Sequence, residues 1–286
     1  MVKLERAVIV NRDTQVSNTA VYKKDLPKSG CYSAIDIGIR VTNGGTSNVN
    51  GDIIDSINHI GLLVNGNEYR HWITGQELFR YHWLKRGQPL AYTFTEILSE
   101  VQEVWFRLYF GRDIGDKQFG LDLSKFDNVQ VVIDYTLANI NAVGATGPLT
   151  GTFAPTIIAH QFPIAQRPSF QGMLGCREFY SITAPGAGEN IQNMPSANPL
   201  YELALFGIID NVQEGTGCTS IRIGKDNFAS TFLNDMWYNL QPIQNEFVDM
   251  NTERVKMFLA DAATRDLHIA NLRKGLLTPT LFTAPT

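Results

Sequence analysis

The sequence has few of the features that mark a metalloprotein, a membrane protein or a secreted protein. Its three cysteines, Cys31, Cys176 and Cys218, contain no Cys-x-x-Cys pair, so they predict neither a zinc site nor a disulfide framework. No uncharged apolar run reaches the roughly 18 residues that a membrane-spanning helix needs. The first residues lack the apolar core of a secretory signal. We therefore expect a soluble, unexported protein with reduced thiols.

Charge is also scarce. Asp, Glu, Lys and Arg make up 18% of the chain, and the formal net charge is -4. Lys and Arg never form a run longer than a pair, whereas a nucleic-acid interface needs a basic surface to neutralise phosphates. The sequence therefore predicts no direct binding of nucleic acid. A chain of 286 residues can form one large or two medium domains without a disulfide or a metal.

Motifs for catalysis and for cofactor binding are missing as well. The glycine-rich stretch 144–151 lacks the Lys-Ser/Thr ending of a phosphate-binding loop, and the sequence has no Gly-x-Ser-x-Gly motif. Among the histidines, His59, His160 and His268 stand alone, and we expect each to be buried or at a strand edge with a backbone partner. The sequence thus predicts no catalytic residue and no cofactor.

One loop gathers acidic side chains. Asp113, Asp116 and Asp122 lie close together in the sequence, and carboxylate oxygens are the ligands that calcium prefers. Their spacing does not match an EF-hand loop, so a solvated loop without a metal is the favoured interpretation. A structural calcium held by these three aspartates is the alternative.

What the chain does contain is the alternation of apolar and polar residues that is typical of half-buried β-strands. The clearest example is the stretch from Ile35 to Val41, in which every second residue is apolar. Similar patterns predict further strands over residues 57–64, 68–73, 90–97, 101–110, 129–136 and 153–162. Residues 1–30 show little periodicity, and we expect them to form an N-terminal arm.

A unit of strand, turn, short strand and helix is predicted twice, about 150 residues apart. In the first copy, Asn65 and Gly66 predict a tight hairpin turn. Thr74 and Glu77 then have the spacing of a capping box, which opens a helix over residues 74–86. The echo predicts two copies of one β-domain, divided near residues 163–172.

The second copy of this unit lies at residues 205–237. A strand pattern over residues 219–223 precedes aromatic and apolar residues at a spacing of four, which predicts a helix. The residues with this spacing are Phe228, Phe232 and Met236.

This order of elements resembles the double jelly-roll major capsid proteins of tailless icosahedral viruses, and especially the corticovirus-like proteins of bacteriophages. The resemblance rests on the hairpin and helix up to residue 86, on the loop and strand 119–134, and on the second hairpin-helix unit 221–239. It implies an all-β chain with two eight-stranded jelly rolls side by side, each with a short helix inserted between strands. The first roll would span residues 31–165, the second 166–275, and a C-terminal tail 276–286.

The resemblance implies a function by assembly rather than by catalysis. It predicts a major capsid protein whose homotrimers form pseudo-hexagonal capsomers in an icosahedral virion shell, after synthesis in the host cytoplasm. Its partners would be neighbouring capsomers, penton and minor capsid proteins, and an internal viral membrane where the virus has one. Residues 43–51 and 141–151 are the loops expected to face outward. The alternative is a β-sandwich carbohydrate-binding or adhesion module of a phage spike or fibre.

Overall fold

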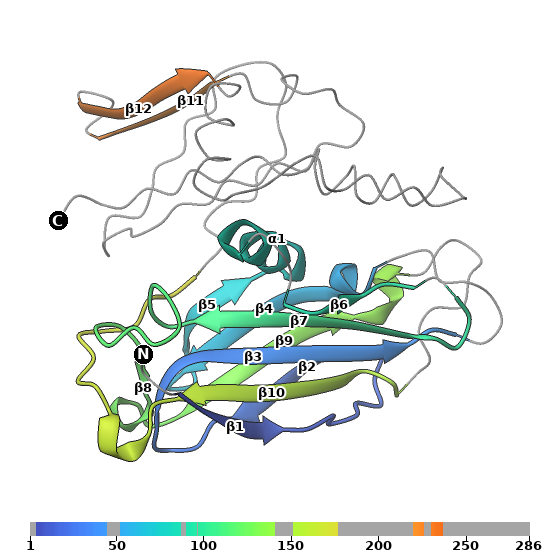
Figure 1. The fold of residues 1–286 in the computed structure, drawn as a ribbon. Helices are drawn as coiled ribbons and strands as arrows, with labels where there is room; N and C mark the ends of the chain where they lie inside the picture. Colours follow the sequence, from blue (N-terminus) through green and yellow to red (C-terminus); the bar gives the residue numbers. More distant parts are fainter. Residues whose placement is uncertain are drawn as a thin grey trace. The chain divides into compact units, whose positions relative to one another are not determined.

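The computed structural model describes residues 4–44, 52–86, 90–95, 97–140 and 151–176, and the backbone of residues 220–225 and 230–236. The chain divides into two compact units. The first comprises Met1–His82 and Pro89–Ala187, and the second comprises Trp83–Gln88 and Gly188–Thr286. Most of the described residues belong to the first unit, which is labelled strand by strand in Figure 1.

The first unit contains two antiparallel sheets, named here the β3 sheet and the β4 sheet. The β3 sheet has the order β1 (Glu5–Val10), β10 (Ala154–Gln161), β3 (Cys31–Thr42), β7 (Val101–Tyr109) and β6 (Tyr92–Thr93), and β8 (Leu121–Asp122) also pairs with β3. The β4 sheet has the order β2 (Thr19–Asp25), β9 (Val129–Thr136), β4 (Ile57–Val64) and β5 (Glu68–Ile73). Three short 3-10 helices lie between strands of the two sheets: η1 (Ile53–Ser56), η2 (Leu123–Lys125) and η3 (Leu137–Ile140). A fourth, η4 (Ile164–Gln166), follows β10.

The chain passes repeatedly from one sheet to the other. Strands β1 and β2 lie in different sheets, β3 returns to the first, β4 and β5 form a hairpin in the second, and β7, β9 and β10 alternate again. Strand β10 finally lies between β1 and β3, so the last strand pairs with the first. This order of the eight longer strands over the two sheets, without the two-residue strands β6 and β8, is a jelly roll. Figure 1 shows β10, β3 and β7 side by side in the β3 sheet.

The roll therefore begins near Glu5, and the predicted arm over residues 1–30 is wrong. Strands β1 and β2 supply one strand to each sheet from within that segment. Both are edge strands whose residues are mostly exposed or half-buried. Because an edge strand buries few side chains, its sequence carries little of the apolar alternation that reveals a strand.

The core lies between the two sheets. Ile35, Ile37 and Ile39 of β3 are fully buried, and so are Val131 and Ile133 of β9. Their spacing of two confirms the predicted strands at these positions. The predicted strand over residues 90–97 is reduced to Tyr92–Thr93.

The hairpin and helix of the first copy are confirmed. Asn65 and Gly66 have positive φ angles of 52° and 75°, as both central residues of a type I′ turn require. The capping box is formed, because the Glu77 amide donates to Thr74 Oγ1 at 3.2 Å and the Thr74 amide donates to Glu77 Oε2 at 3.3 Å. Helix α1 follows as Gly75–Arg86.

The second copy differs from the prediction. Strands β11 (Ser220–Lys225) and β12 (Ser230–Met236) form an antiparallel hairpin, so the helix predicted through Phe232 and Met236 is wrong. Residues four apart share one face in a strand as well as in a helix, and this spacing therefore does not distinguish the two. Residues 166–176, which were predicted to begin the second roll, belong to the first unit. The remaining predictions for the second roll and for the tail lie outside the described residues.

Candidate functional site

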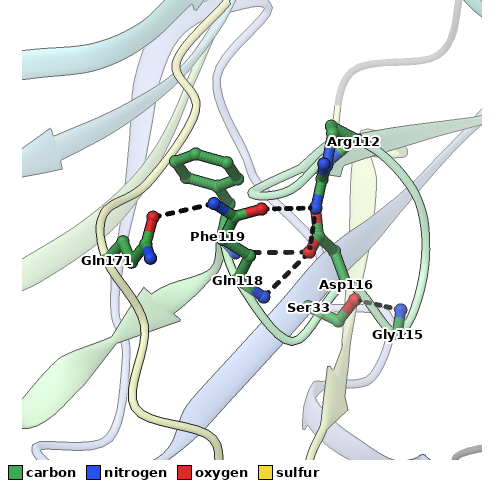
Figure 2. A network of polar contacts seen from close by, with 7 residues as sticks. All are labelled: Ser33, Arg112, Gly115, Asp116, Gln118, Phe119 and Gln171. Carbon is green, nitrogen blue, oxygen red and sulfur yellow. Dashed lines mark hydrogen bonds and ion pairs between the residues drawn. The ribbon is translucent and has the colours of Figure 1, made fainter. Parts of the chain in front are cut away.

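The loop after β7 folds around the carboxylate of Asp116, as Figure 2 shows. Asp116 Oδ2 accepts hydrogen bonds from Nε of Arg112 at 2.8 Å and from the Arg112 amide at 3.0 Å. Its Oδ1 accepts from Nη2 of Arg112 at 3.1 Å and from the Gln118 amide at 2.9 Å. The Arg112 hydrogen bond, helped by these amides, holds the pKa of Asp116 far below its usual range.

This loop is anchored on two sides. The Gly115 amide donates to Ser33 Oγ at 2.7 Å, which ties the loop to the start of β3. On the other side, Gln118 Nε2 donates to Gln171 Oε1 at 2.8 Å (Figure 2). The Gln171 backbone amide also donates to the Gln118 carbonyl at 2.9 Å. The loop is thus a rigid end of the roll, with Ile114 partly exposed at its tip.

The three aspartates predicted as a weak calcium site do not come together. Asp113 is exposed, Asp116 is bound by Arg112, and Asp122 Oδ1 accepts from the Ser124 amide at 3.1 Å to cap η2. Within the described residues, no group of three His, Cys, Asp or Glu side chains has the arrangement of a metal site. A structural calcium stays a prediction without a cluster of ligands to support it.

The hydrogen bonds that Asp116 accepts from Arg112 and Gln118, named here the Asp116 clamp, allow a direct test of the rigidity of the loop. Asp116→Ala should raise the exchange rates of the Gln118 and Arg112 amides by about ten- to a hundredfold, because a hydrogen bond to a charged group contributes about 1.5–3 kcal/mol. Asp113→Ala, at an exposed position of the same loop, is the control and should leave these rates unchanged. Equal rates in the two variants, measured by hydrogen exchange, would contradict the clamp.

A second polar group joins three neighbouring strands of the β3 sheet. Arg107 of β7 donates to both carboxylate oxygens of Asp36 of β3, at 2.5 and 2.8 Å. Nε2 of His160 in β10 lies 2.7 Å from Asp36 Oδ2, and all three side chains are at most 7% exposed. Burial alone would raise the pKa of Asp36, but the hydrogen bonds and charges of Arg107 and His160 lower it to about 2.

The sequence did not indicate this ion cluster, defined as Asp36, Arg107 and His160. Asp36 occupies a polar position of an alternating strand and was expected on its less buried face. The structure buries it because long side chains from both neighbouring strands cover β3. Trp105 lies over Gly38, where an added Cβ would come within 2.6 Å of the Trp105 ring. The only sequence signal is the presence of opposite charges within two apolar strands, and the strand register is needed to pair them.

The other described histidines have structural contacts. His71 Nδ1 accepts from the Cys176 amide at 3.1 Å, and His82 Nε2 donates to the Arg107 carbonyl at 2.6 Å. His59 stacks on Trp72 with a ring separation of 4.6 Å. His160 has a carboxylate partner in place of the backbone partner that was expected. His268 lies outside the described residues.

None of the helices described in the structure has the length and apolar character needed to cross a membrane.

The comparisons with known proteins give fold likeness only at low sequence identity. No protein-family model matches the sequence, and no curated protein matches it. The STIV major capsid protein superposes with a TM-score of 0.62 at 11% identity, over 86% of this chain and 81% of that chain. The chain has the double jelly-roll fold of viral major capsid proteins. This likeness establishes the fold alone, because a sequence identity of 11% is too low to transfer a function.

Two further solved structures are similar to this chain to different degrees. In the structure of Sulfolobus Turreted Icosahedral Virus, one chain superposes with a TM-score of 0.53 at 12% identity, over 86% of this chain and 76% of that chain. The major capsid protein P2 from Bacteriophage PM2 matches over 55% of this chain and 50% of its own, at 14% identity and a TM-score of 0.34. The first comparison supports the fold, and the second is too weak to add to it.

Proposed function

We propose that this protein is a major capsid protein, which assembles with copies of itself into an icosahedral virion shell. The observation that carries the proposal is the double jelly-roll likeness, which extends over 86% of the chain. In this proposal the function resides in assembly, and the protein carries out no reaction. We also infer that the second unit, which includes Gly188–Thr286, supplies the second roll.

The surface of the first roll is compatible with contacts between copies. Val8 of β1 is 62% exposed and Val21 of β2 is 51% exposed, and both lie on edge strands. Apolar side chains on an exposed edge suit burial against another protein surface. In a closed ring of three copies, each copy contributes two different patches, one to each neighbour. The proposal includes a trimeric capsomer and a bacteriophage source. It also includes contacts of the capsomer with penton and minor capsid proteins and with an internal membrane.

The oligomeric state of the full chain tests this proposal. Native mass spectrometry at micromolar concentration should show a species of three times 31.9 kDa, about 96 kDa. Val8→Lys combined with Val21→Lys places two charges on the edge strands and should shift the protein towards monomer if these valines are buried in the assembly. Ile164→Lys, at an 81% exposed position outside these strands, is the matched control. Monomer at every concentration, together with specific glycan binding, would instead favour the adhesion module.

A further inference from the structure

The last described segment of the first unit, residues 170–176, forms a strap that connects the two sheets. Near its middle, the Leu174 amide donates to the Phe110 carbonyl at 3.0 Å, directly after β7 of the β3 sheet. At its end, the Trp72 amide of β5 donates to the Cys176 carbonyl at 3.0 Å. Gly175 packs so closely on β5 that an added Cβ would lie 2.3 Å from the Arg70 carbonyl oxygen. The strap is thus bound next to the β3 sheet through Leu174 and to the β4 sheet through Cys176.

The bond that completes this attachment depends on a histidine. The Cys176 amide donates to Nδ1 of His71 at 3.1 Å, and the His71 side chain is 1% exposed. A ring nitrogen accepts a hydrogen bond only through its lone pair, so the imidazole is neutral and carries its proton on Nε2 while the strap is bound. A second proton on the ring, bound to Nδ1, would place one N–H group opposite the N–H of Cys176, and the two donors would repel each other. The same protonation that charges the ring therefore removes the acceptor of this bond.

Few charged groups lie on the elements that contact the His71 ring. On its own strand the neighbour is Arg70, which pairs with Glu68 at 3.0 Å. From β4 the cross-strand partner is Leu62, which has no charge. The ring of Phe110 meets the His71 ring edge-on at 5.5 Å, and the Arg112–Asp116 pair follows Phe110 along the chain. On the strap, the titratable residue at this contact is Cys176, whose amide binds the ring. The loop after β7 carries two carboxylates, the exposed Asp113 and Asp116, and Asp116 is already bound by Arg112.

We propose that the end of the strap is a proton-operated latch, which is closed while His71 is neutral and opens when Nδ1 takes up a proton. Acid then frees residues 175–176 from β5, while the rest of the strap stays bound through Leu174 and Gln171. The latch lies at the end of the last described segment of the first unit, so acid loosens the attachment of that end to β5. The inference concerns the first roll alone and does not depend on the proposed capsid function.

Hydrogen exchange of the full-length protein between pH 7.5 and pH 5 tests the latch. The quantity to compare is the protection factor, because the intrinsic exchange rate itself changes with pH. Below about pH 6.5, where histidines ordinarily take up their second proton, the protection of the Trp72 and Cys176 amides should fall by up to about tenfold per pH unit. The Leu174 and Gly120 amides, bound to carbonyl oxygens, should keep their protection.

Two variants separate the latch from a general acid effect. His71→Asn keeps an acceptor near the position of Nδ1 but does not titrate, so protection should stay high at both pH values. His71→Phe has no acceptor, so protection should be low at both. The Val131 amide in the core strand β9 reports global unfolding and should not change in the wild type. A flat pH profile in the wild type, or a wild-type profile in His71→Asn, would overturn the proposal.

Discussion

Asp36→Ala is expected to lower the free energy of unfolding by about 3–5 kcal/mol, because it leaves the buried guanidinium of Arg107 without its counter-charge. His160 loses its carboxylate partner at the same time. Arg107 and Asp36 are 5% and 7% exposed, so water cannot replace the lost carboxylate. Equilibrium urea unfolding, followed through tryptophan fluorescence, measures the change. Trp105 lies on the same sheet and reports on this region.

The matched control for this variant is Glu68→Ala. Its ion pair with Arg70 is similar in length, at 3.0 Å, but the two side chains are 46% and 42% exposed. Such surface pairs contribute about 1 kcal/mol at most. A loss in Asp36→Ala no larger than in this control would show that the ion cluster does not stabilise the roll.

The same aspartate makes the stability of the roll depend on pH. Its pKa falls from 3.8 to about 2 in the folded protein, so the folded state binds this proton more weakly than the unfolded state. The stabilisation from Asp36 is therefore fully present above pH 3.8 and is lost as the pH falls towards 2. Asp36→Asn, which has no proton to gain, should flatten this part of the stability profile.

The second large effect is expected in the core. Phe153→Ala should cost about 3–5 kcal/mol, because it opens a cavity between the two sheets. The Phe153 ring is fully buried and stacks on Tyr135 of β9, with a ring separation of 3.6 Å and an angle of 4° between the rings. The lost contact therefore joins β9 of the β4 sheet to the residue directly before β10 of the β3 sheet. Unfolding by urea gives the measurement here as well.

Two further variants show whether this loss comes from burial. Phe153→Leu retains part of the apolar volume and should cost less than Phe153→Ala. Ile164→Ala removes an apolar side chain that is 81% exposed, and it should change stability by no more than about 0.5 kcal/mol. Similar losses in Ile164→Ala and Phe153→Ala would contradict the assignment of Phe153 to the core.

The sequence predicted those parts of the fold in which local chemistry is decisive. The turn at Asn65 and Gly66 needs positive φ angles, and the capping box at Thr74 and Glu77 satisfies free amides, so both have signals within a few residues. The edge strands β1 and β2 have no such signal, because their place is fixed by pairing with β10 and β9. Strand β12 was missed because Phe232 and Met236 have a spacing that fits both a helix and a strand.

The polar sites show the same limit. Asp116 was singled out as an acidic residue, but its partner Arg112 lies only four residues earlier and converts a predicted metal ligand into a loop clamp. In the ion cluster, Asp36 and Arg107 are 71 residues apart, and Asp36 and His160 are 124 residues apart. No local pattern records a contact over such distances. Only the register of β10, β3 and β7 brings the three side chains together.

The pairing of the first strand with the last has a consequence for how each chain is made. Glu5 of β1 lies opposite Gln161 of β10, and their side chains interact across 156 positions of the sequence. At about 5–20 residues per second, a ribosome needs roughly 8–30 s to add the residues between them. Throughout that time β1 waits without its neighbour, and such long-range pairing is intrinsically slow to form. The backbone amides and carbonyls of β1 therefore stay without their strand partner until β10 has been synthesised.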